Sequence, residues 1–409
     1  MATGGLGLSD TVAANMQSNL TAFSYLLPLF GAVIVDKYIG ARYTTPVGMF
    51  IAAAGYFTGG IAKSATGVYV MIFLVSLGLA LFKNGAIIGR VITDKSQMDP
   101  AFSMRYTLVN VGAFIGTFLV GILYKDVFAK NGVLGFAPCF KMAALMMVLG
   151  GLWYIFVCWR FLGDLGKLPF KKTLTEEEKA AEAKKKEETG TKQPLTTIEK
   201  KRIGAIFVAS LFSIVFWIFW YLGYMPVYFY WAENMDWVVA GYQVPSTWFD
   251  AANSLFCVIL GPLTAALWKK LAARPQGDMS LFRKTGLGIA IIGVGYLFYA
   301  AIDIMRGGEK ASVLWLIVFA FLLTMGEMFF SPLGHSFISK YSPSRYLAVM
   351  MSVWGFATFI AAKSYGPVYG LLFGGKIEFK VACIGVAVVS FAAALIMIAL
   401  DKKLSALVD

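Results

Sequence analysis

The chain has few charged residues for its size. Asp, Glu, Lys and Arg make up 14% of its 409 residues, whereas hydrophobic residues make up 58%. An average soluble domain has about 25% charged and 45–50% apolar residues. The composition therefore excludes both an ordinary soluble fold and a disordered chain. The formal net charge of +13 does not require a nucleic-acid partner, because a basic membrane protein gathers Lys and Arg on its cytoplasmic side.

Residues that build metal and redox sites are also scarce. The chain has one histidine, His335, and four cysteines that lie in apolar runs without paired spacing. The sequence contains no metal-ligand cluster, nucleophile elbow or phosphate loop. We therefore expect no enzyme and no cofactor or metal. The most basic water-exposed stretch is interleaved with glutamates, so we expect no nucleic-acid partner either.

Long hydrophobic runs take the place of these features. A bilayer-spanning helix needs about 20 mostly apolar residues. Such runs occur near 13–35, 43–63, 66–92, 102–124 and 137–160, and then near 203–231, 246–268, 282–304, 312–340, 345–373 and 378–400. The sequence predicts an all-α polytopic membrane protein of about 11 transmembrane helices, 5 + 6, in two bundles.

A charged segment separates the two sets of runs. We predict an N-terminal bundle over 1–161, a linker over 162–202 and a C-terminal bundle over 203–409. The many Lys and Arg residues of the linker place it in the cytoplasm, and alternation then puts the C-terminus there and the N-terminus outside. We expect a multi-pass protein of the cell (plasma or inner) membrane, with the lipid bilayer as its surroundings.

Two ionisable residues lie in apolar runs of different bundles. Lys83 is in LFKNGAIIGRVI (81–92), and Glu327 is in the run near 312–340. A charge at the centre of a membrane helix costs roughly 2.5–3.5 kcal/mol, so such residues usually serve a function. A zwitterion would complement both. Alternatively, Lys83 pairs with Glu327 or Asp250 across the bundles, or extends to the membrane surface.

The loop over 31–44, GAVIVDKYIGARYT, joins the first two runs. Its residues resemble the G-x-x-x-D-R-x-G-R-R loop of the major facilitator superfamily, in which a tight turn and its charges lock neighbouring helices at the cytoplasmic face. The alternative is an ordinary positively charged cytoplasmic loop. The matching positions are Gly31, Asp36, Lys37, Gly40 and Arg42.

Further segments resemble the proton-coupled oligopeptide transporter (POT/PTR) family of that superfamily. LFKNGAIIGRVI is similar to the family's F-K-P-N-x-x-x-x-x-G segment, and FSMRYTLVNVGAFIG (102–116) to F-Y-x-x-I-N-x-G. GEMFFSPLGHSFISKYSP resembles G-E-x-x-x-S-P-x-G, MMSVW resembles M-M-G-x-W, and VPSTWFDAANSLF resembles the start of the eighth helix. The segments follow the family's order from about residue 8 to the end.

This resemblance implies a secondary active transporter of di- and tripeptides with the major facilitator fold, driven by protons through alternating access. Lys83 would meet the peptide carboxylate and Glu327 its ammonium, and Trp354 would shape a side-chain pocket. The substrate-binding residues implied are Lys83, Tyr106, Asn110, Asn253, Glu327, Ser331 and Trp354.

The chain departs from the family pattern at several points. The family's first helix, with its E-x-x-E-R-F-x-Y-Y-G segment, has no counterpart, so we expect a truncated start or a lost helix. Tyr221 stands where the family has a glutamate, and a tyrosine does not titrate near neutral pH. The candidate groups for proton coupling are Lys83, Glu327, Lys363 and His335. Alternatively, Lys363 neutralises Glu327 or Asp250, and His335 lines the cavity or lies at a helix end.

These departures leave two alternatives to proton-coupled peptide symport. One is a facilitator or exporter of another small zwitterion without proton coupling. The other is a membrane sensor that binds a ligand without transporting it.

Overall fold

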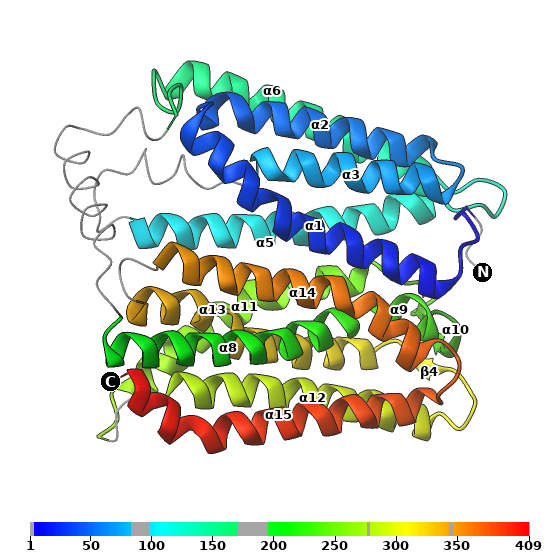
Figure 1. Cartoon of the computed structure of the whole chain (residues 1–409). Helices are drawn as coiled ribbons and strands as arrows, with labels where there is room; N and C mark the ends of the chain where they lie inside the picture. The colour runs from blue at the N-terminus through cyan, green and yellow to red at the C-terminus, as the bar shows by residue number, and fades with distance from the viewer. Residues whose placement is uncertain (1–3, 83–97, 170–194, 276–278, 343–346, 409) are drawn as a thin grey trace. The chain divides into compact units, whose positions relative to one another are not determined.

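The computed structural model describes residues 4–82, 98–169, 195–275, 279–342 and 347–408, most of which are helical (Figure 1). Contacts divide the chain into two compact units. The first comprises Met1–Leu108 and Ile122–Gln193, and the second comprises Val109–Gly121 and Pro194–Asp409. The division falls inside helix α5 (Met98–Ile122).

The first unit is built on helices α1 (Asp10–Lys37), α2 (Ala41–Ile61), α3 (Ala65–Phe82) and α6 (Phe136–Phe161), with the π-helical turn η2 (Leu123–Val127) after α5. Helix α2 packs against α3 and α6, and α1 packs against α3. A Cβ on Gly48 would lie 2.6 Å from the carbonyl oxygen of Gly78. Glycine at both positions therefore allows the backbones of α2 and α3 to cross closely.

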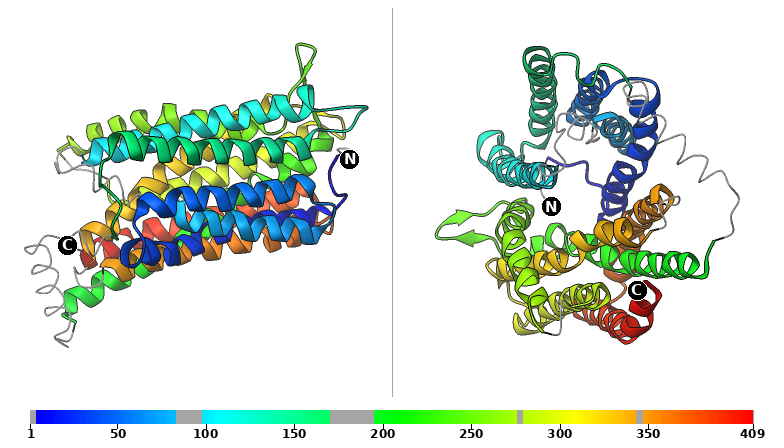
Figure 2. Two further views of the ribbon diagram at one scale, coloured as in Figure 1. Left: turned by 90° about the horizontal axis from the view of Figure 1, so that it is seen from above. Right: turned by 90° about the vertical axis from the view of Figure 1, so that its left-hand side faces the viewer.

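The second unit contains α8 (Thr197–Leu222), α9 (Met225–Tyr228), α10 (Tyr230–Asn234), α11 (Trp248–Ala272), α12 (Leu281–Met305), α13 (Trp315–Tyr341), α14 (Leu347–Phe373) and α15 (Phe379–Val408). Helix α12 packs against α13 and α15, α8 against α14 and α15, and α11 against α13. The long helices of this unit run roughly parallel or antiparallel to one another in the views of Figure 2.

Short strands connect the helices at one end of this unit. Strand β1 (Met235–Asp236) pairs in parallel with β4 (Ala311–Ser312), and β2 (Val238–Val239) pairs antiparallel with β3 (Tyr242–Gln243). The turn residues Ala240 and Gly241 have φ angles of 49° and 80°. Positive φ at both central residues matches a type I′ turn, whose twist suits a two-residue hairpin.

Helices occupy the apolar runs predicted from the sequence. In the described ranges a helix lies on each predicted run, and the third is described as far as Phe82. Eight helices in the described part of the chain are long and apolar enough to cross a membrane. Backbone polar groups in lipid must be bonded within the segment, which is why apolar runs of this length become helices.

The first helix of the second unit differs from its prediction at both ends. Helix α8 begins at Thr197 instead of near 203, because Thr196 and Glu199 form a capping box with bonds of 2.9 and 3.2 Å. It ends at Leu222, so the run 203–231 is not one continuous helix. Pro226 lies in the first turn of α9, and its missing N–H cannot continue the hydrogen-bond ladder of α8.

Candidate functional site

Helices α11 and α13 bring a set of polar side chains together inside the second unit. The Asn253 amide on α11 donates to the Thr324 hydroxyl of α13 at 2.8 Å and to the Glu327 carboxylate at 3.4 Å. The Cys257 thiol, one turn beyond Asn253, donates to the same carboxylate oxygen at 3.8 Å. Residues three and four apart lie on one face of a helix, so α11 and α13 each present a polar face to the other here.

Among the described residues, the hydrogen-bond contacts of the Glu327 carboxylate are with neutral groups. Asn253 is 8% exposed and Thr324 is fully buried. In the part of the chain that the structure describes, no Lys or Arg forms an ion pair with Glu327. A buried carboxylate held by neutral donors is costly unless it meets a cation or a proton. The arrangement therefore suits an amine that arrives with a ligand.

A second carboxylate lies on α11, one turn before Asn253. Asp250 is in the first turn of this helix and accepts a hydrogen bond from the hydroxyl of Tyr228, which belongs to α9. Asp250 and Asn253 are three residues apart and so lie on a similar face. The α9–α11 contact is absent from the sequence prediction, because the break after α8 that positions Tyr228 was not foreseen.

Trp354 lies in an aromatic cluster beside the polar set. Its ring stacks on Phe330 with centroids 6.0 Å apart, and Phe330 in turn stacks on Phe216 of α8 at 4.0 Å. Trp354 is 7% exposed, and Phe216 and Phe330 are buried as well. The cluster joins α8, α13 and α14, so Trp354 forms part of a rigid apolar wall.

Tyr221, which replaces an expected acid, belongs to the same wall. It stacks on Tyr365 of α14 at 5.2 Å and lies 5.8 Å from the ring of Trp217. Its side chain is buried. The ring of Tyr221 is therefore packed between aromatic rings of α8 and α14.

Several predicted residues lie outside the description. Lys83 is outside the described residues, as are the side chains of Ser331, His335 and Asp36. The backbones of Ser331 and His335 belong to α13, and that of Asp36 belongs to α1. Their proposed roles stay predictions.

The remaining predicted residues are on α5 and α14. Tyr106 and Asn110 are on α5, Tyr106 with 50% exposure in the first unit and Asn110 in the second. Lys363 is an exposed residue of α14.

The loop between α1 and α2 is anchored by close backbone approaches. A Cβ on Gly31 would meet the backbone carbonyl of Ala80 on α3 far inside 3.0 Å, and one on Gly40 would meet the carbonyl of Gly166 in the same way. The N–H of Arg42 donates to that Gly166 carbonyl at 3.1 Å. Glycine at these positions thus allows α1 to lie on α3 and the loop to lie on the segment after α6.

Charged groups complete this anchor. The Arg42 guanidinium donates to the carbonyl of Gly163, and Lys37 is an exposed residue in the last turn of α1. Asp164 and Lys167 form an ion pair of 2.5 Å in the same segment. The hydrogen bond from Lys167 lowers the pKa of the exposed Asp164 carboxyl below its usual value. The loop is therefore held by Arg42 and glycine contacts.

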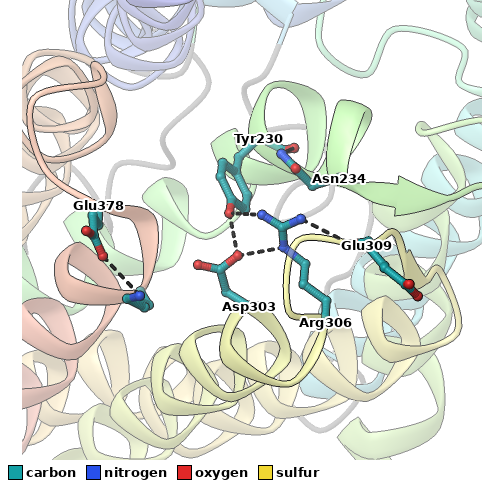
Figure 3. A network of polar contacts seen from close by, with 7 residues as sticks. Tyr230, Asn234, Asp303, Arg306, Glu309 and Glu378 are labelled. Carbon is teal, nitrogen blue, oxygen red and sulfur yellow. Dashed lines mark hydrogen bonds and ion pairs between the residues drawn. The ribbon is translucent and has the colours of Figure 1, made fainter.

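A polar network ties α10 to the end of α12 in the second unit (Figure 3). The hydroxyl of Tyr230 donates to Asp303, and Arg306 donates to Asp303 at 2.7 Å and to the Tyr230 hydroxyl at 2.7 Å. The Tyr230 ring stacks on Phe379 of α15 at 3.7 Å. The network fixes α10 against the ends of α12 and α15. The sequence does not predict this network, because Tyr230 and Asp303 are 73 positions apart.

The second unit also has an open apolar pocket of about 420 Å³. No charged residue lines it, so it offers no partner for the ends of a zwitterion. Its lining includes Phe114, Phe118, Trp237, Tyr242, Trp248 and Leu316. In the described residues, His, Cys, Asp and Glu side chains form no group of three that could hold a metal ion.

Comparison with known families agrees with this arrangement. The pattern of the family described as "PTR2: POT family" matches residues 164–373. The chain is similar to the "Uncharacterized transporter YclF" of Bacillus subtilis (strain 168), with 25% identity over 402 residues, which cover 88% of this chain and 79% of that protein. It is also 25% identical over 400 residues to a "Di-/tripeptide transporter" of Lactococcus lactis subsp. cremoris, covering 86% of this chain and 78% of that one.

Solved structures give the same fold. A crystal structure of a mutant peptide transporter POT in complex with alafosfalin superposes with a TM-score of 0.85. Its sequence identity is 23%, and the match covers 99% of this chain and 89% of that chain. The chain therefore has the fold of the POT transporters of the major facilitator superfamily.

Proposed function

The chain belongs to the POT family, and we propose on that basis that it is a secondary active transporter that carries di- and tripeptides across a membrane. We propose further that protons drive the transport by symport. The family match and the di-/tripeptide transporter of Lactococcus lactis support the substrate class. The protein is a multi-pass membrane protein of a transporter family.

Glu327 is the observation that carries this proposal. Its carboxylate is held by the neutral donors Asn253 and Cys257, at 3.4 and 3.8 Å. The Asn253 distance exceeds the roughly 2.7–2.9 Å of a charge-assisted N–H···O bond, and the Cys257 thiol is a weak donor, so the carboxylate keeps capacity for a stronger donor. In this proposal that donor is the α-ammonium of the peptide.

The other end of the peptide requires a cation. Lys83 is the residue proposed for the peptide carboxylate, as its place in an apolar run suggests. The further residues proposed to line the substrate are Tyr106, Asn110, Asn253, Ser331 and Trp354. The buried aromatic cluster of Trp354 supports a rigid wall for a peptide side chain, because its rings leave little freedom to rearrange.

The orientation in the membrane is also a proposal. Positive charge in the 162–202 segment supports a cytoplasmic linker and C-terminus in the cell (plasma or inner) membrane. The α1–α2 loop would then be on the cytoplasmic side. Its contacts with the segment after α6 support a role in holding that side of the first unit together.

Tyr221 favours a second candidate function. Where the family resemblance implies an acid, this residue is packed between aromatic rings and carries no charge near neutral pH. A transporter that lost this acid without replacement would be a facilitator or exporter of a small zwitterion without proton coupling.

Transport by purified protein in liposomes separates these functions. We expect labelled dialanine to exchange against internal dialanine, and to accumulate when the outside is acidified. Exchange without accumulation would indicate the facilitator. Dialanine binding without any flux would indicate a sensor and would overturn the proposal. Empty liposomes and liposomes with Glu327→Gln protein are the controls, and the second is expected to show strongly reduced exchange.

A further inference from the structure

Asp250 is a membrane carboxylate for which the proposed function gives no role. It lies in the first turn of α11, inside an apolar helix. Its hydrogen-bond partner is the Tyr228 hydroxyl, a neutral group. Within the described ranges, no Lys or Arg forms an ion pair with it. Intramembrane carboxylates without a structural partner usually mark ion or proton pathways.

The surroundings of Asp250 support both of its charge states. The start of a helix carries a partial positive charge that favours an anion, and the Tyr228 hydroxyl donates to it. Burial in the bundle penalises the same anion, so binding a proton relieves that penalty. A group stabilised in each state by a different effect can gain and lose a proton during a cycle. Among the titratable groups, Tyr228 contacts Asp250, Tyr224 packs on the neighbouring Phe249, and Cys257 and Glu327 meet about two turns further along α11.

A polar row connects Asp250 with the proposed substrate site. Asp250, Asn253 and Cys257 follow helical spacing on one side of α11, and the last two contact Glu327. The Tyr224 ring lies 5.2 Å from the ring of Phe249, the residue before Asp250. A proton on Asp250 would therefore change the field at the site that meets the peptide.

Two acids are needed if one of them meets the substrate. Glu327 cannot hold a proton while it pairs with a peptide ammonium, because the pairing requires its ionised form. Tyr221 offers no carboxylate on α8. Asp250 is a carboxylate beside this site, and it contacts Tyr228 just beyond the break between α8 and α9. It is therefore the candidate for the second acid.

The contact with Tyr228 also joins the charge of Asp250 to the break between α8 and α9. Helix α8 ends before Gly223, and Tyr228 belongs to the short helix α9 beyond this break. A hydrogen bond to an ionised acceptor is about twice as strong as one between neutral groups. Protonation of Asp250 would thus weaken the contact that holds α9 to α11.

We propose that Asp250 binds the coupling proton of this transporter and that its protonation loosens Tyr228, which frees α9 to move against α11. This inference rests on the proposed function. One proton from the outside is bound by the carboxylate, and the same proton is released inside, so no other reactant is needed.

The test compares two kinds of transport by variants in liposomes. Exchange of labelled for unlabelled dialanine needs no net proton movement, whereas accumulation driven by an acid exterior does. We expect Asp250→Asn to keep exchange and to lose proton-driven accumulation, and Asp250→Glu to recover part of it. Asp303→Asn is the matched control, because Asp303 is a membrane carboxylate already paired with Arg306, and it should keep proton-driven accumulation.

Tyr228→Phe provides a second, milder measurement. It leaves the carboxylate in place and removes the donor that favours the ionised form. We expect half-maximal accumulation to move to a higher external pH, by up to about one unit, because a net hydrogen bond of ordinary strength corresponds to roughly that shift. An unchanged pH profile would contradict the role of Tyr228.

The outcomes separate the inference from the proposed function. Absence of exchange by the wild type would overturn the proposed function. If the wild type exchanges and accumulates, proton-driven accumulation by Asp250→Asn would overturn the inference by itself. Loss of exchange as well in a correctly folded Asp250→Asn protein would make Asp250 a structural or substrate residue, which also overturns it. A wild type that exchanges but does not accumulate would refute proton coupling and the inference together.

Discussion

The pairing between Glu327 and a peptide ammonium can be tested by removing each partner in turn. The protein partner is removed by Glu327→Gln, which keeps the shape of the side chain and an oxygen that can accept from Asn253. The ligand partner is removed by acetylating the N-terminus of dialanine. If both changes break the same contact, their effects on affinity will not add.

The expected magnitude follows from the contacts of Glu327. Its bonds to Asn253 and Cys257, at 3.4 and 3.8 Å, come from neutral donors, so a peptide ammonium would add a charged donor to them. A hydrogen bond to a charged group contributes about 1.5–3 kcal/mol. This corresponds to roughly a 10- to 150-fold preference of the wild type for dialanine over its acetylated form.

Competition against the binding of labelled dialanine to the purified protein measures this preference, because it does not depend on exchange by the variant. The inhibition constants of the free and acetylated dipeptides are compared in the wild type, in Glu327→Gln and in Glu309→Gln. Glu309 is an exposed glutamate of the same unit, so its variant should behave as the wild type. We expect the preference to fall to about one in Glu327→Gln, because this variant has already lost the contact with the ammonium that acetylation removes.

One result would refute this reasoning directly. If Glu327→Gln binds dialanine more weakly but keeps the full preference over the acetylated form, the ammonium has a different partner. The carboxylate would then serve the packing of α11 against α13 instead of the substrate.

Two further predictions concern stability, each measured by thermal unfolding in detergent. Gly31→Ala should lower the unfolding temperature by an amount on the order of 5 °C, because overpacking against a rigid backbone costs about 1–3 kcal/mol. The control is Gly385→Ala, at an open helical position, which should be neutral or slightly stabilising. An equal effect of the two would contradict the close contact of α1 and α3. Arg306→Ala should destabilise the protein by about 2–3 kcal/mol, because the Asp303 side chain, 9% exposed, would lose its cation. Adding Asp303→Asn to this variant should recover part of the lost stability. No recovery would argue against the pairing of Arg306 with Asp303.

Helix positions could be predicted closely where lipid decides the structure. The run expected at 282–304 became α12, Leu281–Met305, and the run at 137–160 became α6, Phe136–Phe161. The reason is local, because an apolar segment in a bilayer must bond its own backbone and can do so as a helix. Departures came at the ends, where capping groups such as Thr196 and Glu199 extend a helix into polar sequence.

Candidate site residues could be named from the sequence, but not their partners. Asn253 and Glu327 were predicted by resemblance, and their mutual contact was not, since they are 74 positions apart. Thr324 was overlooked, although its spacing of three from Glu327 on a helix puts it on the same face. Attention to that spacing would have found it.

The sequence by itself determined that this protein spans a membrane, where its helices lie, and to which family it belongs, because apolar runs and short motifs are local properties of the chain. Only the tertiary structure decided that α8 breaks before α9, that Tyr228 meets Asp250, and that Gly31 lies on the backbone of Ala80. These contacts depend on how helices far apart in the chain pack against each other. No local pattern specifies such packing, because each helix face could fit several neighbours until the whole bundle is assembled.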